Sequence, residues 1–260
     1  MYKQNMLAAF IVASIAVALN AQPARGYYRE MPEELLEGSE EARAVARLGD
    51  LSPVSVRERL KQMRAPAFLP TSKQIKKAIE SQDMPIANYK RIDRLKSALQ
   101  PVLDYHERSR MQIFVLDSNL PKSLLIGHSV ILITTRMRHI ANDQEIRGIV
   151  AHELAHEYVW DELFKAQKEK DWKLVRECEL FCDVVAAFTL KEIGDDPASY
   201  GRILQRMTII SSIEGSTTIK QSRTHPSLDA RLKLNKFLCR KFSSQYSVFS
   251  FQLEEFFLKT

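Results

Sequence analysis

The pattern of apolar and polar residues predicts a mostly helical chain with a short β region near its middle. Apolar residues recur at helical spacing in 71–107, 199–213 and 229–238, and each range is therefore predicted to be helical. The ranges 112–117 and 130–135 are rich in Ile, Val and Leu and predict two strands. We expect an α+β fold, mostly helical, with a small β-sheet.

A long helical region follows the second predicted strand. Asn142 is a suitable N-cap residue, and Glu145 can reach back to it in a capping box. No Gly or Pro occurs between Gly148 and Gly194, so the pattern predicts helix throughout, broken by a polar turn near 168–171. Two helices that follow each other in this way can pack side by side and bring their polar residues to one site.

The first of these helices contains the motif His152-Glu153-Leu154-Ala155-His156. Histidines four residues apart lie on one helix face, so both imidazoles can bind the same metal ion. The glutamate beside the first histidine can act as a general base on water, and the H-E-x-x-H pattern is typical of zinc hydrolases. A catalytic zinc site also needs a third protein ligand.

The second helix offers two carboxylates for this purpose. Glu179 follows His156 after twenty-two intervening residues, and Asp183 lies four residues further on, so both carboxylates face one side. One of them can bind the metal, and the other can accept a hydrogen bond from a ligand imidazole. The spacing alone leaves open which carboxylate has which role.

A third segment is Thr224-His225-Pro226, with Arg231 six residues after its histidine. In this order the three motifs resemble those of the HtpX/CAAX prenyl endopeptidase family of zinc metallopeptidases, which are gluzincins. The resemblance covers about 89–234. It implies a zincin-like metallopeptidase domain with an active-site helix and one Zn²⁺ per chain, held by His152, His156 and Glu179.

The same resemblance implies roles for four more residues. Glu153 would be the general base, and Asp183 would hydrogen-bond to a ligand of the metal. His225 and Arg231 would lie near the carbonyl oxygen of the substrate. In some relatives the histidine that matches His225 instead covers the zinc in a latent state.

The segment before the metal-binding helix departs from the family pattern. Relatives often have Asn-Ala-Phe and Gly-Gly where this chain has 122–129, and alanine where it has Cys182. The strand 130–135 directly precedes the helix, and we interpret it either as an edge strand that pairs with an extended peptide substrate or as an ordinary core strand. The candidate substrate-binding residues are Val130, Leu132 and Thr134.

Composition divides the remaining chain into four parts. The start has a lysine, an apolar run and small residues, which is typical of a secretory signal peptide; an uncleaved membrane anchor is the alternative. An acidic and then basic segment follows, with short helices expected at 31–48 and 53–64. The predicted parts are a signal peptide at 1–21, an N-terminal extension or regulatory pro-segment at 22–70, the metallopeptidase domain at 71–240, and a phenylalanine-rich tail at 241–260 that packs on the domain.

The formal net charge of +6 does not change the predicted function. The basic residues are scattered, so the charge does not predict nucleic-acid binding. The predicted signal peptide indicates an exported protein of the periplasm or cell envelope. The resemblance implies protein or peptide substrates such as misfolded envelope proteins. Two alternatives remain: a zinc-binding adaptor in quality control that does not cleave, and a tail that contacts the membrane surface.

The three cysteines and two isolated histidines leave other questions open. Cys239 could form a disulfide with Cys178 or Cys182, the thiols could compete with Glu179 as metal ligands, or all three could be buried free thiols. His106 and His139 flank predicted helices, and we expect both on the surface.

Overall fold

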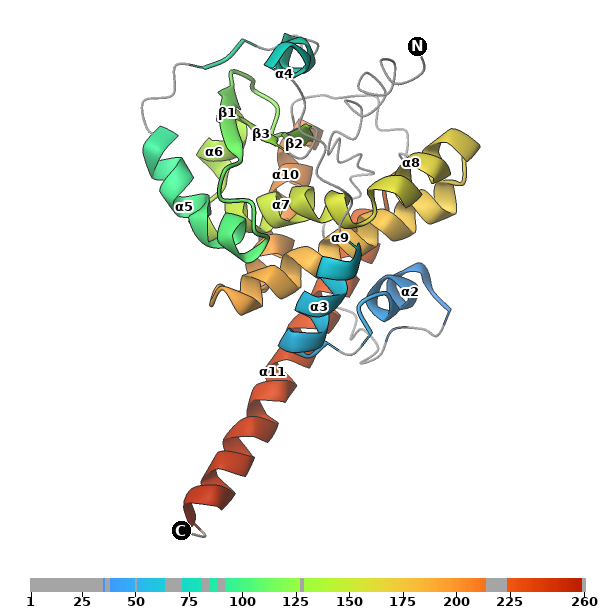
Figure 1. The fold of residues 1–260 in the computed structure, drawn as a ribbon, viewed down its shortest axis with the longest axis vertical. Helices are drawn as coiled ribbons and strands as arrows, with labels where there is room; N and C mark the ends of the chain where they lie inside the picture. Colours follow the sequence, from blue (N-terminus) through green and yellow to red (C-terminus); the bar gives the residue numbers. More distant parts are fainter. Residues whose placement is uncertain are drawn as a thin grey trace.

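Most of the described chain is helical, and one small β-sheet lies on one side of α7 (Asp143–Ala155), with α9 (Trp172–Glu192) on its other side (Figure 1). The computed structural model describes residues 35, 38–49, 51–63, 72–80, 85–87, 92–126, 129–213 and 224–258. This arrangement confirms the expectation of a mostly helical α+β fold. The predicted signal peptide at 1–21 lies outside the described residues.

Helices occupy most of the predicted ranges, but the expected continuous helix before 168 is also broken at His156–Tyr158, and the short helix Thr135–Ile140 was not predicted. The helices are α2 Glu40–Ala46, α3 Pro53–Met63, α4 Ser72–Glu80, α5 Ile92–Tyr105, α6 Thr135–Ile140, α7 Asp143–Ala155, a 3₁₀ turn His156–Tyr158, α8 Trp160–Glu169, α9 Trp172–Glu192, α10 Ala198–Ile213 and α11 Leu228–Leu258. The break predicted near 168–171 is confirmed, because Lys170 ends α8 in a left-handed conformation and Asp171 caps α9. In the range 31–48 only Glu40–Ala46 is helical among the described residues.

The sheet has three strands, β1 Gln112–Leu116, β2 Ser123–Ile126 and β3 Val130–Thr134, in the order β1-β3-β2. β3 is parallel to β1 and antiparallel to β2, so it is the central strand. The interpretation of β3 as an edge strand is therefore wrong. The reason is β2, a strand that was not predicted, which pairs with β3 on the side opposite β1.

Alternation along β3 also places the three candidate substrate-binding residues away from the metal-binding helix. Ile131 and Ile133 belong to a core cluster with residues of α7, whereas Val130 and Leu132 pack on the opposite face with Ile79 of α4. Successive side chains of a strand point to opposite faces, so one set must turn away. Thr134 is buried as well, and its hydroxyl donates to the carbonyl of Leu120 and caps α6.

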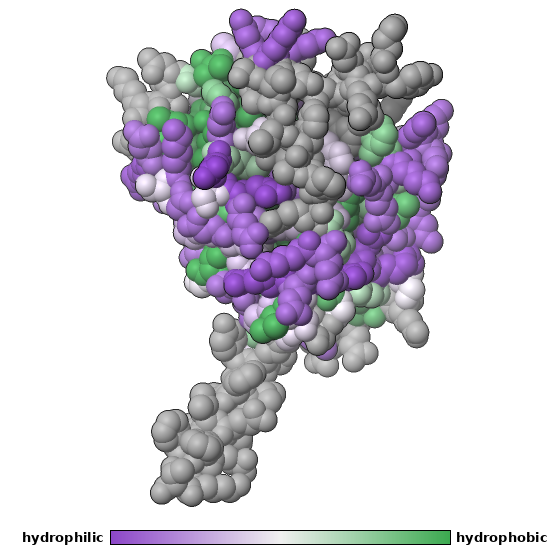
Figure 2. Space-filling model, viewed as in Figure 1, coloured by the Kyte–Doolittle hydropathy of each residue, from purple (hydrophilic) through white to green (hydrophobic). Residues whose placement is uncertain are grey.

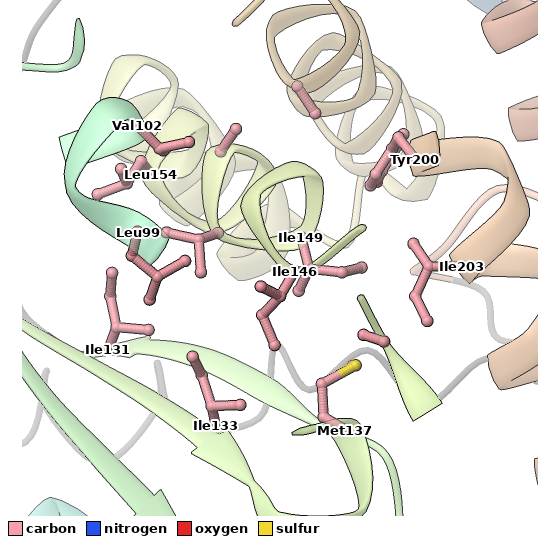
Figure 3. Close-up of a cluster of buried hydrophobic side chains, with 14 of the residues drawn as sticks. Leu99, Val102, Ile131, Ile133, Met137, Ile146, Ile149, Leu154, Tyr200 and Ile203 are labelled. Carbon is pink, nitrogen blue, oxygen red and sulfur yellow. The ribbon is translucent and has the colours of Figure 1, made fainter. Parts of the chain in front are cut away.

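One hydrophobic core lies between the sheet, α5, α7 and α10 (Figure 3). Ile146 and Ile149 of α7 face Ile131 and Ile133 of β3, and Tyr200 of α10 closes the other side of α7. Burying these side chains fixes the rotation of α7 about its axis, because a helix with an apolar stripe packs in one orientation. The polar residues of α7 are thereby turned toward α9.

A second core surrounds α9 and includes the described part of the N-terminal segment. Leu48, next to α2, and Val56 and Leu60 of α3 are buried together with Phe181 and Phe188 of α9. Two ion pairs join α2 to α9, Arg43 with Glu177 at 2.6 Å and Arg176 with Glu40 at 2.7 Å. The helices α2 and α3 thus contribute to the same packed body as the sheet and α7.

The last helix is much longer than predicted. Instead of ending at 238, α11 continues to Leu258, and its C-terminal half extends away from the other described elements (Figure 1). Phe242, near the start of the predicted tail, is buried in the core around α9, and packing of the remaining tail on the domain stays a prediction. No Gly or Pro interrupts 228–258, so the helix continues without a turn. None of the described helices combines the length and apolar character that a membrane crossing requires. The described surface in Figure 2 is mainly hydrophilic.

Candidate metal centre

The H-E-x-x-H motif lies at the C-terminal end of α7, with His156 as the C-cap residue that begins the 3₁₀ turn. The predicted capping box is present at the start of α7. The Asn142 side chain accepts a hydrogen bond from the backbone N–H of Glu145, and the Glu145 carboxylate accepts one from the backbone N–H of Asn142, both at 2.9 Å. Arg206 of α10 holds the same carboxylate at 2.7 Å. Together these contacts fix the first residue of α7. They thereby also fix the helical turn in which His152 and His156 lie.

His152, His156 and Glu179 form a buried cluster in which one ligand atom from each lies within 4.8 Å of the others. His152 Nε2 lies 3.5 Å from Glu179 Oε2, and His156 Nε2 lies 4.0 Å from Glu179 Oε1. Tetrahedral zinc with bonds of about 2.0–2.1 Å separates its ligand atoms by about 3.4 Å, so a small contraction would suffice. His152 Nε2 is buried with no hydrogen-bond partner, which a bound metal would supply. The cluster could hold a metal ion.

Behind His152, three residues from three helices form a hydrogen-bonded network. Asp183 of α9 lies 2.9 Å from His152 Nδ1 and accepts two hydrogen bonds, at 2.8 and 2.6 Å, from Arg231 of α11. Tyr200 of α10 donates to Asp183 at 2.6 Å. Asp183 is therefore the hydrogen-bond partner of the His152 imidazole, whereas Glu179 faces the two histidines.

These contacts shift the pKa values of both His152 and Asp183. Burial lowers the pKa of His152, but the hydrogen bond that its ring donates to the Asp183 carboxylate and the nearby Glu179 carboxylate outweigh burial and raise that pKa to about 9 in the metal-free chain. Burial raises the pKa of Asp183, but the charge of Arg231 outweighs it and lowers that pKa to about 2. Asp183 is therefore ionised at neutral pH and can orient the imidazole.

The second imidazole has a weaker partner. His156 Nδ1 lies 3.5 Å from the Cys182 sulfur, and burial lowers the pKa of His156 to about 4. The neutral form that this low pKa favours is the form that binds a metal. Cys182 lies behind the ring and outside the ligand cluster, so the thiol is not one of the clustered ligand atoms.

Glu153 lies beside the cluster with an unsatisfied carboxylate oxygen. Its Oε1 is buried without a hydrogen-bond partner, and burial raises its pKa to about 8 in the metal-free chain. A hydrogen bond from the backbone of Leu125 in β2 lowers the pKa of Glu153 and so opposes the effect of burial. The strand that approaches the site is thus β2, at the sheet edge, and not the predicted β3.

The third motif reaches the cluster through His225. Its Nε2 lies 3.9 Å from Glu179 Oε2, while its Nδ1 lies 2.8 Å from the hydroxyl of Thr224. Arg231, which was expected near a substrate carbonyl, instead places its buried guanidinium on Asp183 and Tyr200. Three of the predicted residues, Glu153, Asp183 and His225, therefore lie around the cluster, and Arg231 binds Asp183 behind it.

Sequence reasoning missed Tyr200 and misplaced His106. Tyr200 appears in the sequence only as one apolar position on a helix face, and nothing local marks its hydroxyl as part of a site. His106 is buried, not exposed, with its ring nitrogens 2.7 Å from the Tyr158 hydroxyl and 3.0 Å from the Thr189 hydroxyl. His139 is exposed, as predicted.

All three cysteines are free thiols, and none forms a disulfide. Cys178 and Cys182 are buried within α9, and burial raises the pKa of Cys178 to about 12. Burial also raises the pKa of Cys239 to about 11. Of the alternatives considered from the sequence, free thiols are the one that the structure contains.

No protein-family model matches the chain, and no curated protein matches its sequence. The functional interpretation therefore depends on the motifs and on the geometry that brings them together.

Proposed function

We propose that this chain is a zinc-dependent endopeptidase of the HtpX-like gluzincin type. The observation that supports this most directly is the buried cluster of His152, His156 and Glu179, whose ligand atoms lie within 4.8 Å of one another. Two histidines and one glutamate are a ligand set typical of catalytic zinc with one position left open. Burying these polar groups together without a metal would be energetically costly.

The roles of the protein groups follow from their positions. When bound, zinc supplies Lewis acidity, which activates water and polarises a carbonyl group. Glu153 accepts a proton from the attacking water through Oε1 and passes it to the leaving amine. The step needs the ionised carboxylate, and the positive charge of a bound metal would favour that form against the pKa of about 8 in the metal-free chain. His225 donates a hydrogen bond to the developing oxyanion through its Nε2. Asp183 keeps His152 oriented throughout.

We place the peptide substrate on β2 in an extended conformation. β2 is at an edge of the sheet among the described residues, and it adjoins the Glu153 carboxylate through Leu125. An extended peptide can add to such an edge through backbone hydrogen bonds. Unfolded protein segments are the substrate class that this mode favours, consistent with a role in quality control of exported proteins.

The test is zinc content and cleavage of an unfolded protein such as reduced casein, with wild type and Glu153→Gln purified in parallel. We expect about one zinc in both proteins and a loss of at least about 10²-fold in cleavage rate for Glu153→Gln. Because the variant passes through the same purification, it controls for contaminating proteases. Near-normal cleavage by Glu153→Gln, or wild type without zinc after reconstitution, would contradict the proposal.

One observation favours a second function, a zinc-binding adaptor without cleavage. His225 Nε2 lies 3.9 Å from Glu179 Oε2, close enough to the cluster to occupy the open metal position. His225→Ala separates the two functions. A rise in casein cleavage would indicate a latent peptidase, a fall would indicate that His225 assists the reaction, and no cleavage by any zinc-loaded variant would support the adaptor.

A further inference from the structure

Tyr200 places its hydroxyl at the centre of the hydrogen bonds behind His152. The oxygen lies 2.9 Å from His152 Nδ1, 2.6 Å from Asp183 Oδ1 and 2.6 Å from Arg231 Nη2. The ring is fully buried and stacks near the imidazole, with centroids 6.0 Å apart and planes 23° apart. A single neutral hydroxyl thus contacts one imidazole of the metal-binding cluster and both members of a buried ion pair.

The donor and acceptor roles at this hydroxyl are determined by its neighbours. A phenol has one proton to donate, and a charged carboxylate at 2.6 Å is a better acceptor than an imidazole nitrogen at 2.9 Å. Arg231 can only donate, so it binds a lone pair of the tyrosine oxygen. With its proton on Asp183, the Tyr200 oxygen presents only an acceptor to His152.

His152 Nδ1 therefore faces two acceptors, Asp183 Oδ1 at 2.9 Å and the Tyr200 oxygen at 2.9 Å. A nitrogen that faces only acceptors carries a proton, so in the neutral imidazole, which is the form that binds a metal, the lone pair is on Nε2. We propose that Tyr200 is a positioning residue that holds His152 in the Nδ1-protonated tautomer, so that Nε2 is available to a metal. This inference depends on the metal centre of the proposed function but not on peptidase activity.

The tautomer that Tyr200 prevents is specific. If the hydroxyl donated to His152 Nδ1, the imidazole proton would move to Nε2 and point at Glu179 Oε2, 3.5 Å away. A proton on His152 Nε2 would take the position in which the lone pair must bind a metal. It would also point at the Glu179 carboxylate, which is the third ligand of the cluster. Arg231 and Asp183 together hold the hydroxyl in the other orientation.

Gly148 allows this arrangement. A Cβ at position 148 would lie 3.2 Å from both Cβ and Cδ2 of Tyr200 and 3.1 Å from Cδ1 of Leu190. Gly148 lies one helical turn before His152 on the same face of α7. The missing side chain therefore lets the tyrosine ring lie against α7 at the height from which its hydroxyl reaches His152.

The test uses Tyr200→Phe, with Tyr105→Phe as the matched control that removes another buried hydroxyl. The zinc Kd is measured by competition with a chromophoric chelator, and the histidine Nδ1–H proton of the zinc-loaded protein is observed by NMR. The signal of His152 is assigned in the zinc-loaded wild type by through-bond correlation along the His152 side chain. We expect Tyr200→Phe to weaken zinc binding about tenfold and to shift or broaden the His152 signal, with Tyr105→Phe within about twofold of wild type.

Unchanged zinc affinity together with an unchanged His152 signal in Tyr200→Phe would overturn the inference. If that variant does not fold, Gly148→Ala decides, because it keeps the hydroxyl but displaces the ring; it should weaken zinc binding severalfold, and wild-type affinity would overturn the inference. If zinc-loaded wild type fails to cleave casein, the proposed peptidase activity is contradicted, but the proposed role of Tyr200 is not. Wild type that binds no zinc would overturn both.

Discussion

The Cys182 sulfur lies 3.5 Å from Nδ1 of His156, in the place where His152 has the Asp183 carboxylate at 2.9 Å. The two imidazoles of the H-E-x-x-H motif therefore have partners of very different strength. A carboxylate is a charged acceptor, whereas a thiol is a weak acceptor and a weak donor. His152 should thus be the more firmly oriented of the two.

This difference predicts an order of effects on zinc affinity. Asp183→Asn removes the charged acceptor behind His152 and should weaken zinc binding about 10–100-fold. Cys182→Ala removes only a weak partner of His156 and should change the affinity less than about threefold. Competition titration with a chelator measures both, and a larger loss in Cys182→Ala would show that the ranking is wrong.

Zinc should stabilise the folded chain, because the three ligands are brought together only by tertiary packing of α7 against α9. At a free zinc concentration about 100-fold above Kd, Tm should rise by roughly 5–10 °C relative to chelated protein. Glu179→Gln should abolish most of this rise. Scanning calorimetry with and without chelator gives the comparison, and an equal rise in Glu179→Gln would place the metal elsewhere.

Arg231 should matter to stability more than any exposed arginine. Its guanidinium is buried on Asp183, and removing one partner of a buried ion pair leaves the other charge uncompensated. Arg231→Met should therefore lower the free energy of unfolding by about 3–5 kcal/mol. Arg202→Met breaks an exposed pair with Asp196 and should cost less than about 1 kcal/mol. Urea denaturation measures both; similar values for the two variants would contradict the buried network.

The N-terminal helices should be required for stability. Leu60 of α3 is buried in the core around α9, so Leu60→Ala should lower the free energy of unfolding by about 2–5 kcal/mol. Val54 lies in the same helix but is 69% exposed, and Val54→Ala should change it by about 0.5 kcal/mol or less. A small effect of Leu60→Ala in urea denaturation would mean that α3 is a detachable segment.

Local signals predicted much of the helical framework. The capping box at Asn142 and Glu145 marks the start of α7, and the polar turn before Asp171 marks the start of α9. Both features involve residues within one or two turns, so their physics is contained in a short stretch of chain. His106 shows where such reasoning ends, since its burial results from Tyr158 and Thr189, which are distant in sequence.

The amino-acid order is enough to predict which residues can share a helix face: His152 with His156, and Glu179 with Asp183. Helical periodicity is a local property, and these pairs follow from it. The packing of α7 against α9 was needed to show that Glu179 faces the two histidines while Asp183 lies behind one of them. The tertiary structure was also needed to show that β3 is central, and that Tyr200 and Arg231 meet at Asp183. These relationships depend on how helices and strands far apart in the chain pack against one another, and no single stretch of sequence specifies that packing.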